Sequence, residues 1–203
     1  ERWEQRAGEV RASLRHLHWS SERGLFVDSV ADGRPSKVVT ELSNAMALQY
    51  GIATPEQAPS IIAHLVNPPA DLLRATALYA VWVAQALASA GESEAATRML
   101  AERYGPMMAV SDFPTLWETS PEPGSWKEGY RISTLHPAAA GAAWFLSTDI
   151  LGVRPLTPAF GCCRIEPRPG HLRSAEGVFP SVRGDIRIQW SAAAGGFSLH
   201  VDL

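Results

Sequence analysis

Cysteine is scarce in this sequence, and the chain has no long apolar run. The only two cysteines among its 203 residues are the neighbours Cys162 and Cys163. Neighbouring residues on a strand point to opposite faces, so we expect two free thiols rather than a disulfide or a shared metal ion. No segment approaches the roughly 18 consecutive apolar residues of a membrane-spanning helix. The histidines are also too scattered to form a metal site. We therefore predict no metal, and we also predict no cofactor and no membrane partner.

Neither sign of charge dominates. The formal net charge is −3, with 18 Lys and Arg against 21 Asp and Glu. A chain without a basic excess is poorly suited to bind nucleic acid, so we predict no nucleic-acid partner. Tryptophan, by contrast, is frequent, with seven Trp against four Tyr. This excess favours a site for carbohydrate or another flat ligand, and the alternative is that Trp fills a helical core.

Helical periodicity runs through the first three quarters of the chain. Thr54 is a capping residue, and Gln57 completes a capping box, so a helix is predicted to start there. Gly51 is placed to end the preceding helix in the left-handed conformation. The apolar sequence after Asp71 is typical of a helix that is buried on most sides. Helices are predicted at residues 3–18, 38–50, 55–66, 71–90, 92–104 and 137–151.

The pattern changes after Arg154, where Gly and Pro become frequent and apolar residues recur at every second position. Alternation of this kind predicts half-buried antiparallel strands at residues 163–166, 185–190 and 196–201. Trp190 lies on the middle run and is predicted to belong to the core. A further short strand is predicted at residues 25–27.

Helices followed by strands indicate a mainly α fold with a β C-terminal part. We therefore predict two units, residues 1–152 and residues 153–203. Helix pairs joined by long polar turns suggest stacked helical hairpins, which form either a solenoid or a closed toroid. The sequence shows no fixed repeat period, and this weakens the solenoid interpretation.

Aromatic and acidic residues gather in residues 111–144, a stretch broken by Pro and Gly. Loops held by a rigid scaffold are common places for binding and catalysis. Flat rings such as Trp117 and Trp126 suit sugar rings, and a carboxylate such as Glu118 suits proton transfer at a glycosidic bond. His136 is suited to bind a hydroxyl or to orient a carboxylate.

Each of these residues also has a structural alternative. Glu118 could cap a helix or pair with an arginine, and His136 could start a helix by bonding to its backbone. Trp117 and Trp126 could fill the core. The sequence leaves these alternatives open.

Five segments in order resemble bacterial α-L-rhamnosidases, which are inverting glycoside hydrolases with an (α/α)6 six-hairpin toroid. They are TLWETS at 115–120, ELSNAMA at 41–47, STLH at 133–136, ILGVRP at 150–155 and GDIRIQW at 184–190. The similarity covers most of the chain but only part of such an enzyme. The family's first toroid half, with its general acid, is missing, and so are the last strands of its C-terminal sandwich.

The resemblance implies that residues 1–152 are part of the toroid and that residues 153–203 are an incomplete antiparallel β-sandwich. It implies hydrolysis of terminal α-L-rhamnosides with inversion, with Glu118 as the general base. Trp117, Trp126 and His136 would line the pocket for a rhamnose-containing glycoside.

The general acid would come from a missing N-terminal part of the same enzyme, so we expect the isolated chain to be inactive. Helix faces that the missing hairpins should cover would favour aggregation or a homo-oligomer. The alternatives are a six-hairpin glycosidase for another sugar and a non-catalytic carbohydrate-binding or structural module.

Overall fold

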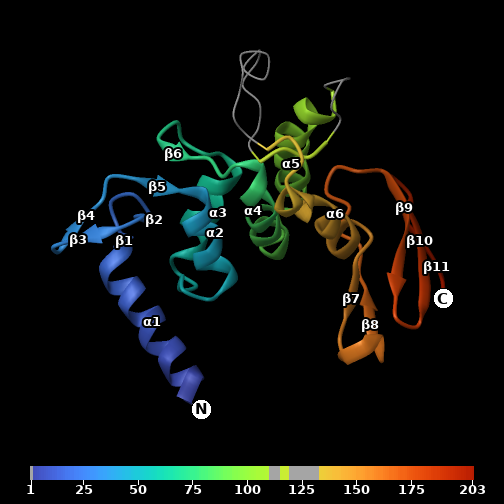
Figure 1. The fold of residues 1–203 in the computed structure, drawn as a ribbon, viewed down its shortest axis with the longest axis horizontal. Coiled ribbons are helices and arrows are strands. Elements are labelled where there is room, and N and C mark those ends of the chain that lie inside the picture. The colour runs from blue at the N-terminus through green and yellow to red at the C-terminus, as the bar shows by residue number, and fades with distance from the viewer. Residues whose placement is uncertain (1, 110–114, 119–132) are drawn as a thin grey trace.

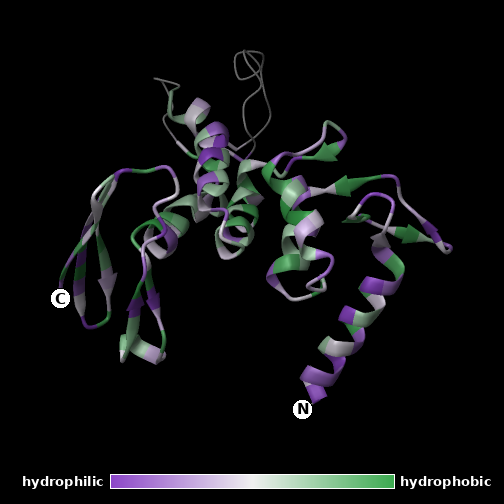
Figure 2. Ribbon diagram, turned by 180° about the vertical axis from the view of Figure 1, so that it is seen from behind, coloured by the Kyte–Doolittle hydropathy of each residue, from purple (hydrophilic) through white to green (hydrophobic). Residues whose placement is uncertain are grey.

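The computed structural model describes residues 2–109, 115–118 and 133–203. Helices occupy the centre of the molecule, with small N-terminal sheets on one side and a larger C-terminal sheet on the other (Figure 1). Apolar residues concentrate on the central helices, and α1 is mostly polar (Figure 2). No helix in the described ranges is both long and apolar enough to cross a membrane.

All five helices predicted before residue 110 are present, with shifted ends. The helices are α1 (Arg2–His18), α2 (Glu41–Gln49), α3 (Ala58–Val66), α4 (Ala77–Ser89) and α5 (Ser93–Met108). Thr40 caps α2 by accepting a hydrogen bond from the Ser43 N–H at 3.2 Å. The predicted box at Thr54 forms only half of its bonds, because the Thr54 N–H donates to Gln57 Oε1 at 2.9 Å but α3 starts later.

The predicted sixth helix is three short helical segments. A 3-10 turn η2 (Pro137–Ala140) leads into α6 (Gly141–Phe145) and then into a π-helical turn η3 (Leu146–Ile150). This run packs closely on α4, since a Cβ at Gly141 would lie 2.7 Å from Val81 Cγ1. Glycine at this position therefore sets the distance between α4 and α6.

Helix α4 is the centre of the core, and nine of its thirteen residues are buried. Helix α1 differs from it, because none of its described residues is buried. Its Trp3 side chain is 79% exposed. Arginines hold it to the body, with Arg11 Nε donating to the Tyr50 carbonyl at 3.0 Å and Arg15 Nη2 to the Gly51 carbonyl at 2.7 Å.

The first half of the chain also contains strands that the sequence did not predict, so the fold is mixed helix and sheet. Six two-residue strands pair in three small sheets, two antiparallel and one parallel. Only β2 corresponds to a predicted strand, because two residues cannot show a period. The strands are β1 (Trp19–Ser20), β2 (Leu25–Phe26), β3 (Val30–Ala31), β4 (Arg34–Pro35), β5 (Val39–Thr40) and β6 (Leu72–Leu73).

The C-terminal part has a hairpin and a three-stranded antiparallel sheet of order β11-β10-β9. The three predicted strands are confirmed as β8, β10 and β11. Strand β9 was not predicted, because small residues such as Gly177 hide its alternation. The bounds are β7 (Val153–Pro155), β8 (Cys163–Ile165), β9 (Ser174–Ser181), β10 (Gly184–Ala193) and β11 (Gly196–Asp202).

The inner face of this sheet packs on the helical part and on the β7–β8 hairpin. Trp190 is 1% exposed, as expected for a core residue, and its Nε1–H donates to the Ile150 carbonyl at 2.8 Å. Phe160 and Phe179 pack with ring centroids 5.3 Å apart. Both parts of the chain therefore contribute to one continuous apolar core.

A buried carboxylate also joins the two parts. Asp149 is fully buried in η3 and pairs with Arg154 and, at 3.0 Å, with Arg168 Nη1. The Arg168 N–H donates to the Asp149 carbonyl at 2.8 Å. Two cations from the segment after η3 are thus held at the end of the helical run.

Candidate functional site

Two short segments, residues 115–118 and 133–136, pair side by side next to the last turn of α5. The Glu118 N–H donates to the Ser133 carbonyl at 3.0 Å, and the His136 N–H donates to the Leu116 carbonyl at 2.9 Å. The Thr115 hydroxyl donates to the Thr134 carbonyl. This antiparallel pairing joins the segment that carries Glu118 to the segment that carries His136, with Glu118 opposite Ser133 and His136 opposite Leu116.

Trp117 anchors this pair of segments in the core. Its side chain is 1% exposed, and its backbone N–H points to the sulfur of the fully buried Met107 at 3.4 Å. The buried indole Nε1–H has no hydrogen-bond partner among the described residues. The ring was expected to stack on a sugar, and in this structure it packs inward beneath Glu118.

Glu118 is half-buried, and its carboxylate is lightly held. One oxygen, Oε2, accepts a hydrogen bond from the Ser133 N–H at 3.3 Å. Glu118 forms no ion pair with any residue that the structure describes. The alternative that Glu118 pairs with an arginine is therefore not observed among the described residues.

His136 directly precedes η2 and is half-buried. Its Nδ1 accepts a hydrogen bond from the Ala138 N–H at 3.3 Å. The structural alternative, a histidine that starts a helix, is thus observed. Because Nδ1 acts as an acceptor, the neutral ring carries its proton on Nε2, which can donate to a ligand hydroxyl. The bond to Ala138 therefore orients the ring without using the nitrogen that a ligand would need.

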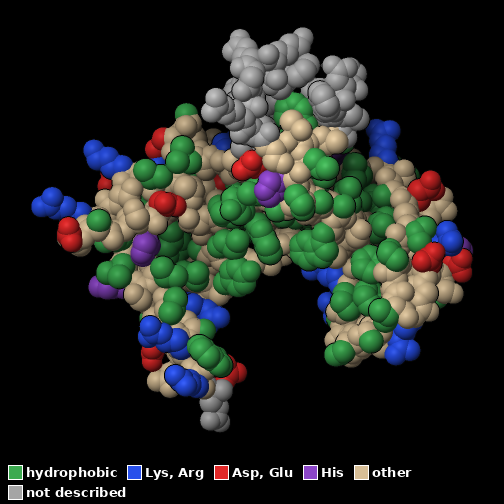
Figure 3. All heavy atoms as spheres, viewed as in Figure 1, with side chains coloured by type: hydrophobic (Ala, Val, Ile, Leu, Met, Phe, Trp, Pro, Cys, Tyr) green, Lys and Arg blue, Asp and Glu red, His purple; other side chains and the backbone are tan. Residues whose placement is uncertain are grey.

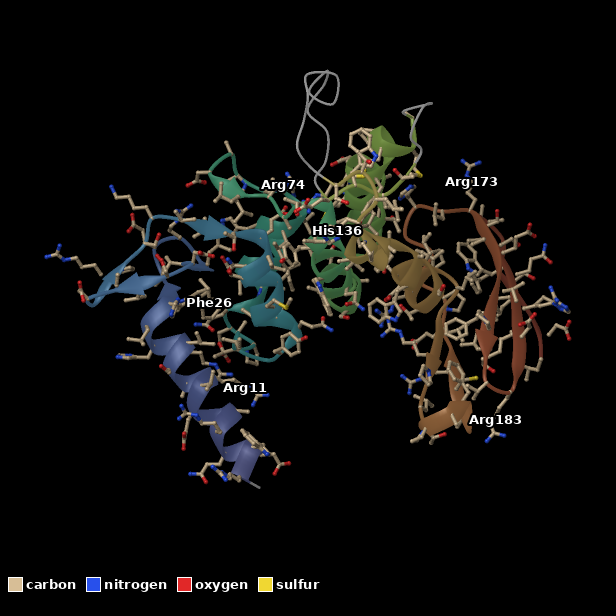
Figure 4. All side chains as sticks on the ribbon, in the orientation of Figure 1. Arg11, Phe26, Arg74, His136, Arg173 and Arg183 are labelled. Atoms are coloured by element: carbon tan, nitrogen blue, oxygen red, sulfur yellow. The ribbon has the colours of Figure 1, made fainter. Side chains whose placement is uncertain are left out.

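A buried ion cluster lies at the same end of the helices, and no pattern in the sequence predicted it. Glu41 is fully buried at the start of α2, with Oε2 at 2.6 Å from Arg103 Nη2 and Oε1 at 2.7 Å from Arg74 Nε. Glu41 Oε2 also accepts from the Ala75 N–H at 2.8 Å. Arg103 lies one helical turn before Met107, so the cluster supports the residue on which Trp117 rests. Figure 4 shows Arg74 and His136 at this end of the helices.

Two other buried polar groups fix the local framework. Asn44 is fully buried, and its side chain bonds both the N–H and the carbonyl of Phe26, at 2.8 Å and 3.0 Å. The Tyr104 hydroxyl donates to the Ala77 carbonyl at 2.5 Å, and burial raises the pKa of this phenol. Both side chains serve the backbone of neighbouring elements.

Of the four residues predicted to form the site, Glu118 and His136 lie on the two paired segments, and Trp117 is buried in the core. Trp126 lies outside the described residues. Among the described residues, no group of three or more His, Cys, Asp or Glu is placed to hold a metal ion. The paired segments carry a carboxylate that can accept a proton and an imidazole that can donate a hydrogen bond.

Residues 152–203 match the family model of the bacterial alpha-L-rhamnosidase C-terminal domain. No curated protein matches the chain. Among solved structures, the chain is similar to the GH78 family rhamnosidase of Bacillus sp. GL1, with 27% identity and a TM-score of 0.82. That match covers 95% of this chain and 21% of the other.

Two more distant structures share the fold. The Streptomyces avermitilis alpha-L-rhamnosidase complexed with L-rhamnose has 20% identity and a TM-score of 0.72, covering 96% of this chain and 19% of its own. The alpha-L-rhamnosidase from Dictyoglumus thermophilum has 16% identity and a TM-score of 0.74, covering 97% of this chain and 22% of its own. The chain thus spans about a fifth of the length of the solved proteins that it matches.

Proposed function

Because the chain resembles the C-terminal part of bacterial α-L-rhamnosidases, we propose that it belongs to a glycoside hydrolase that releases terminal α-L-rhamnose with inversion. The observation that carries the proposal is the pairing of the Glu118 and His136 segments. It supports the proposal because one of the paired segments carries a carboxylate and the other carries a hydrogen-bond donor.

Glu118 would be the general base. Inversion requires one carboxylate to deprotonate a water on one face of the sugar while a second carboxyl group, about 6.5–9.5 Å away, protonates the leaving oxygen. A carboxylate held by one backbone N–H, with no cation beside it in the described ranges, keeps lone pairs available for that water. The general acid would lie outside these 203 residues, because the chain spans only 21% of the Bacillus enzyme.

His136, Trp126 and Trp117 would shape the sugar pocket. The Nε2–H of His136 would donate to a ring hydroxyl, because its Nδ1 is already occupied by the Ala138 N–H. Trp126 would stack on the sugar, as its neighbours in the sequence suggest. The buried Trp117 would act as the apolar wall that holds Glu118 in place.

Residues 1–152 would form part of an (α/α)6 toroid, and residues 153–203 part of a β-sandwich. Apolar side chains on the helices support the first assignment, because Trp3 on α1 is 79% exposed and Trp82 on α4 is 37% exposed. Neighbouring hairpins of a closed toroid would cover such faces. The packing of the β7–β8 hairpin and the β9–β11 sheet through Phe160 and Phe179 supports the second.

The test is Glu118→Gln in the full enzyme that contains this chain, assayed on p-nitrophenyl α-L-rhamnopyranoside. We expect kcat to fall roughly 10²–10⁴-fold, because the base is removed and the shape is kept. Glu166→Gln is the matched control, since Glu166 is exposed on the β7–β8 hairpin side and pairs only loosely, at 3.8 Å, with Arg164. An unchanged kcat in Glu118→Gln would show that Glu118 is not the general base, and it would favour the alternative that this chain is a non-catalytic module of the enzyme.

Two further readouts separate the remaining alternatives. Proton NMR of the first product formed should show the β-anomer of rhamnose, and the α-anomer would contradict inversion. A preference for another aryl glycoside would indicate a six-hairpin enzyme for a different sugar. The isolated 203-residue chain should not turn over the rhamnoside, because it would supply one carboxyl group of the required pair.

A further inference from the structure

The outer face of the β9–β11 sheet carries polar side chains in cross-strand rows. Gln189 on β10 is paired in register with Glu176 on β9 and with His200 on β11. The next row along the strands joins Ser191 to Ser174 and Ser198 in the same register. These rows lie opposite the apolar face that packs on the helices.

This face is hollowed. A hollow of about 710 Å³ is lined mainly by the two polar rows, and Ala175 and Trp190 also contribute to its lining. A second hollow of about 460 Å³ continues along the strands toward Arg187 and Asp202. Both hollows include Glu176, Gln189 and His200, so they form one trough that crosses all three strands. Figure 3 shows charged side chains gathered over this sheet, in contrast to the apolar surface over the central helices.

Three polar side chains at the centre of the trough have no partner in the described part of the protein. Among the described residues, the side chains of Glu176, Gln189 and His200 make no hydrogen bond or ion pair with another residue. The sheet does not need them for packing, because Ile188 and Trp190 on the opposite face supply its core contacts. Their donors and acceptors are therefore available to a ligand.

The chemistry of the trough selects the ligand class. Its charges are two carboxylates, Glu176 and Asp202, and one guanidinium, Arg187, which also lies 3.7 Å from Asp185. This balance disfavours an anion. An apolar ligand would desolvate the amide and hydroxyl groups without giving them partners, which is costly. Side chains such as Gln189 both donate and accept, as sugar hydroxyls do.

The spacing also suits a sugar chain. Neighbouring strands lie about 4.8 Å apart, and residues on one face of a strand recur about every 6.8 Å, so three rows span about 14 Å. The larger hollow, at about 710 Å³, is within the usual range for small-ligand sites, about 300–1,000 Å³. We propose that this outer face of the C-terminal sheet binds a neutral oligosaccharide through Glu176, Gln189 and His200.

The proposed site is separate from the Glu118 site. The two lie on different elements, and no residue of the trough belongs to the paired segments that hold Glu118 and His136. Glu118→Gln should therefore leave oligosaccharide binding unchanged, and loss of trough binding should leave kcat on a small aryl glycoside unchanged. The experiments can therefore show that the proposed function has failed while oligosaccharide binding holds, or the reverse.

The test is a ¹⁵N NMR titration of the full chain with maltotetraose and methyl α-L-rhamnoside as neutral probes and trigalacturonate as an anionic probe. We expect saturable shifts on β9, β10 and β11 with maltotetraose at a Kd of about 1 mM, since the contacts are polar and open to water. The trigalacturonate should bind more weakly, because of the carboxylates. No shift on these strands with either neutral probe, or a preference for trigalacturonate, would overturn the proposal.

Three variants locate the site. Gln189→Ala should weaken neutral binding about tenfold, and Gln49→Ala, an exposed glutamine at the end of α2, should not. Glu176→Gln keeps the hydrogen-bonding shape without the charge, so it should bind maltotetraose within about twofold of the original chain. Equal weakening by Gln189→Ala and Gln49→Ala, or loss of binding in Glu176→Gln, would contradict a neutral-sugar site here.

Discussion

Replacing Glu41 with glutamine should destabilise the protein strongly. Glu41 is fully buried, and its carboxylate is the shared partner of Arg103 at 2.6 Å and Arg74 at 2.7 Å. Glu41→Gln keeps the size and an oxygen that can accept from the Ala75 N–H, but it removes the negative charge. The guanidinium of Arg103, whose side chain is only 8% exposed, would then lose its buried ion pair with Glu41.

The size of the effect follows from burial. Breaking a buried ion pair by removing one partner costs about 3–5 kcal/mol. The lower end applies here, because the Arg74 side chain is 47% exposed and can be solvated by water. We expect about 3 kcal/mol, which is a large share of the roughly 5–15 kcal/mol of a typical domain. Trp117 rests on Met107, one turn from Arg103, so the loss should also loosen the Glu118 segment.

Urea unfolding followed by tryptophan fluorescence measures this loss. Glu94→Gln is the matched control, since Glu94 and Arg98 form an exposed pair at 3.9 Å, and its change should stay within about 0.5 kcal/mol. Glu41→Gln combined with Arg103→Met should be less destabilised than the sum of the two single variants, by about 1–3 kcal/mol. A loss below about 1 kcal/mol for Glu41→Gln would refute the argument that the buried ion pair between Glu41 and Arg103 stabilises the fold.

Two further predictions concern buried aromatic side chains. Trp190→Phe removes the donor to the Ile150 carbonyl and leaves a small cavity. The free energy of unfolding measured in urea should therefore fall by about 2–3 kcal/mol with an unchanged m-value. A loss below about 0.5 kcal/mol would contradict the packing described. Burial raises the pKa of Tyr104, so the folded chain keeps this proton to higher pH than the unfolded chain, and stability should fall as pH rises above about 10. Tyr104→Phe should flatten that alkaline part of the stability curve measured by thermal unfolding, and an unchanged slope would show that Tyr104 does not cause it.

Part of the candidate site was accessible from the sequence. The segments around Glu118 and His136 carry recognisable patterns, and the resemblance predicted that both residues belong to one sugar site. The burial of Trp117 could not be predicted from the sequence, because an indole next to a carboxylate has the same sequence pattern whether its ring faces a ligand or the core. The direction of that ring depends on Met107, a residue of another element.

The ion clusters were also hidden from sequence reasoning. Glu41 at a helix start looks like an ordinary helix-dipole residue, and Asp149 looks like one polar residue in an Ala-rich helix. Each becomes a buried, doubly paired carboxylate only because arginines from other structural elements or loops reach it. Contacts between different elements leave no local period in the sequence.

The sequence by itself determined where the main helices lie and which C-terminal residues form alternating strands, because capping residues and apolar spacing act within a few positions along the chain. It also determined the inward side of β10, since Ile186, Ile188 and Trp190 share one face of a strand. Only the tertiary structure decided the two-residue strands, the pairing of the segments that carry Glu118 and His136, and the polar trough on the outer face. These features depend on the register between segments, which is set by burying apolar surface and satisfying backbone hydrogen bonds across the whole molecule.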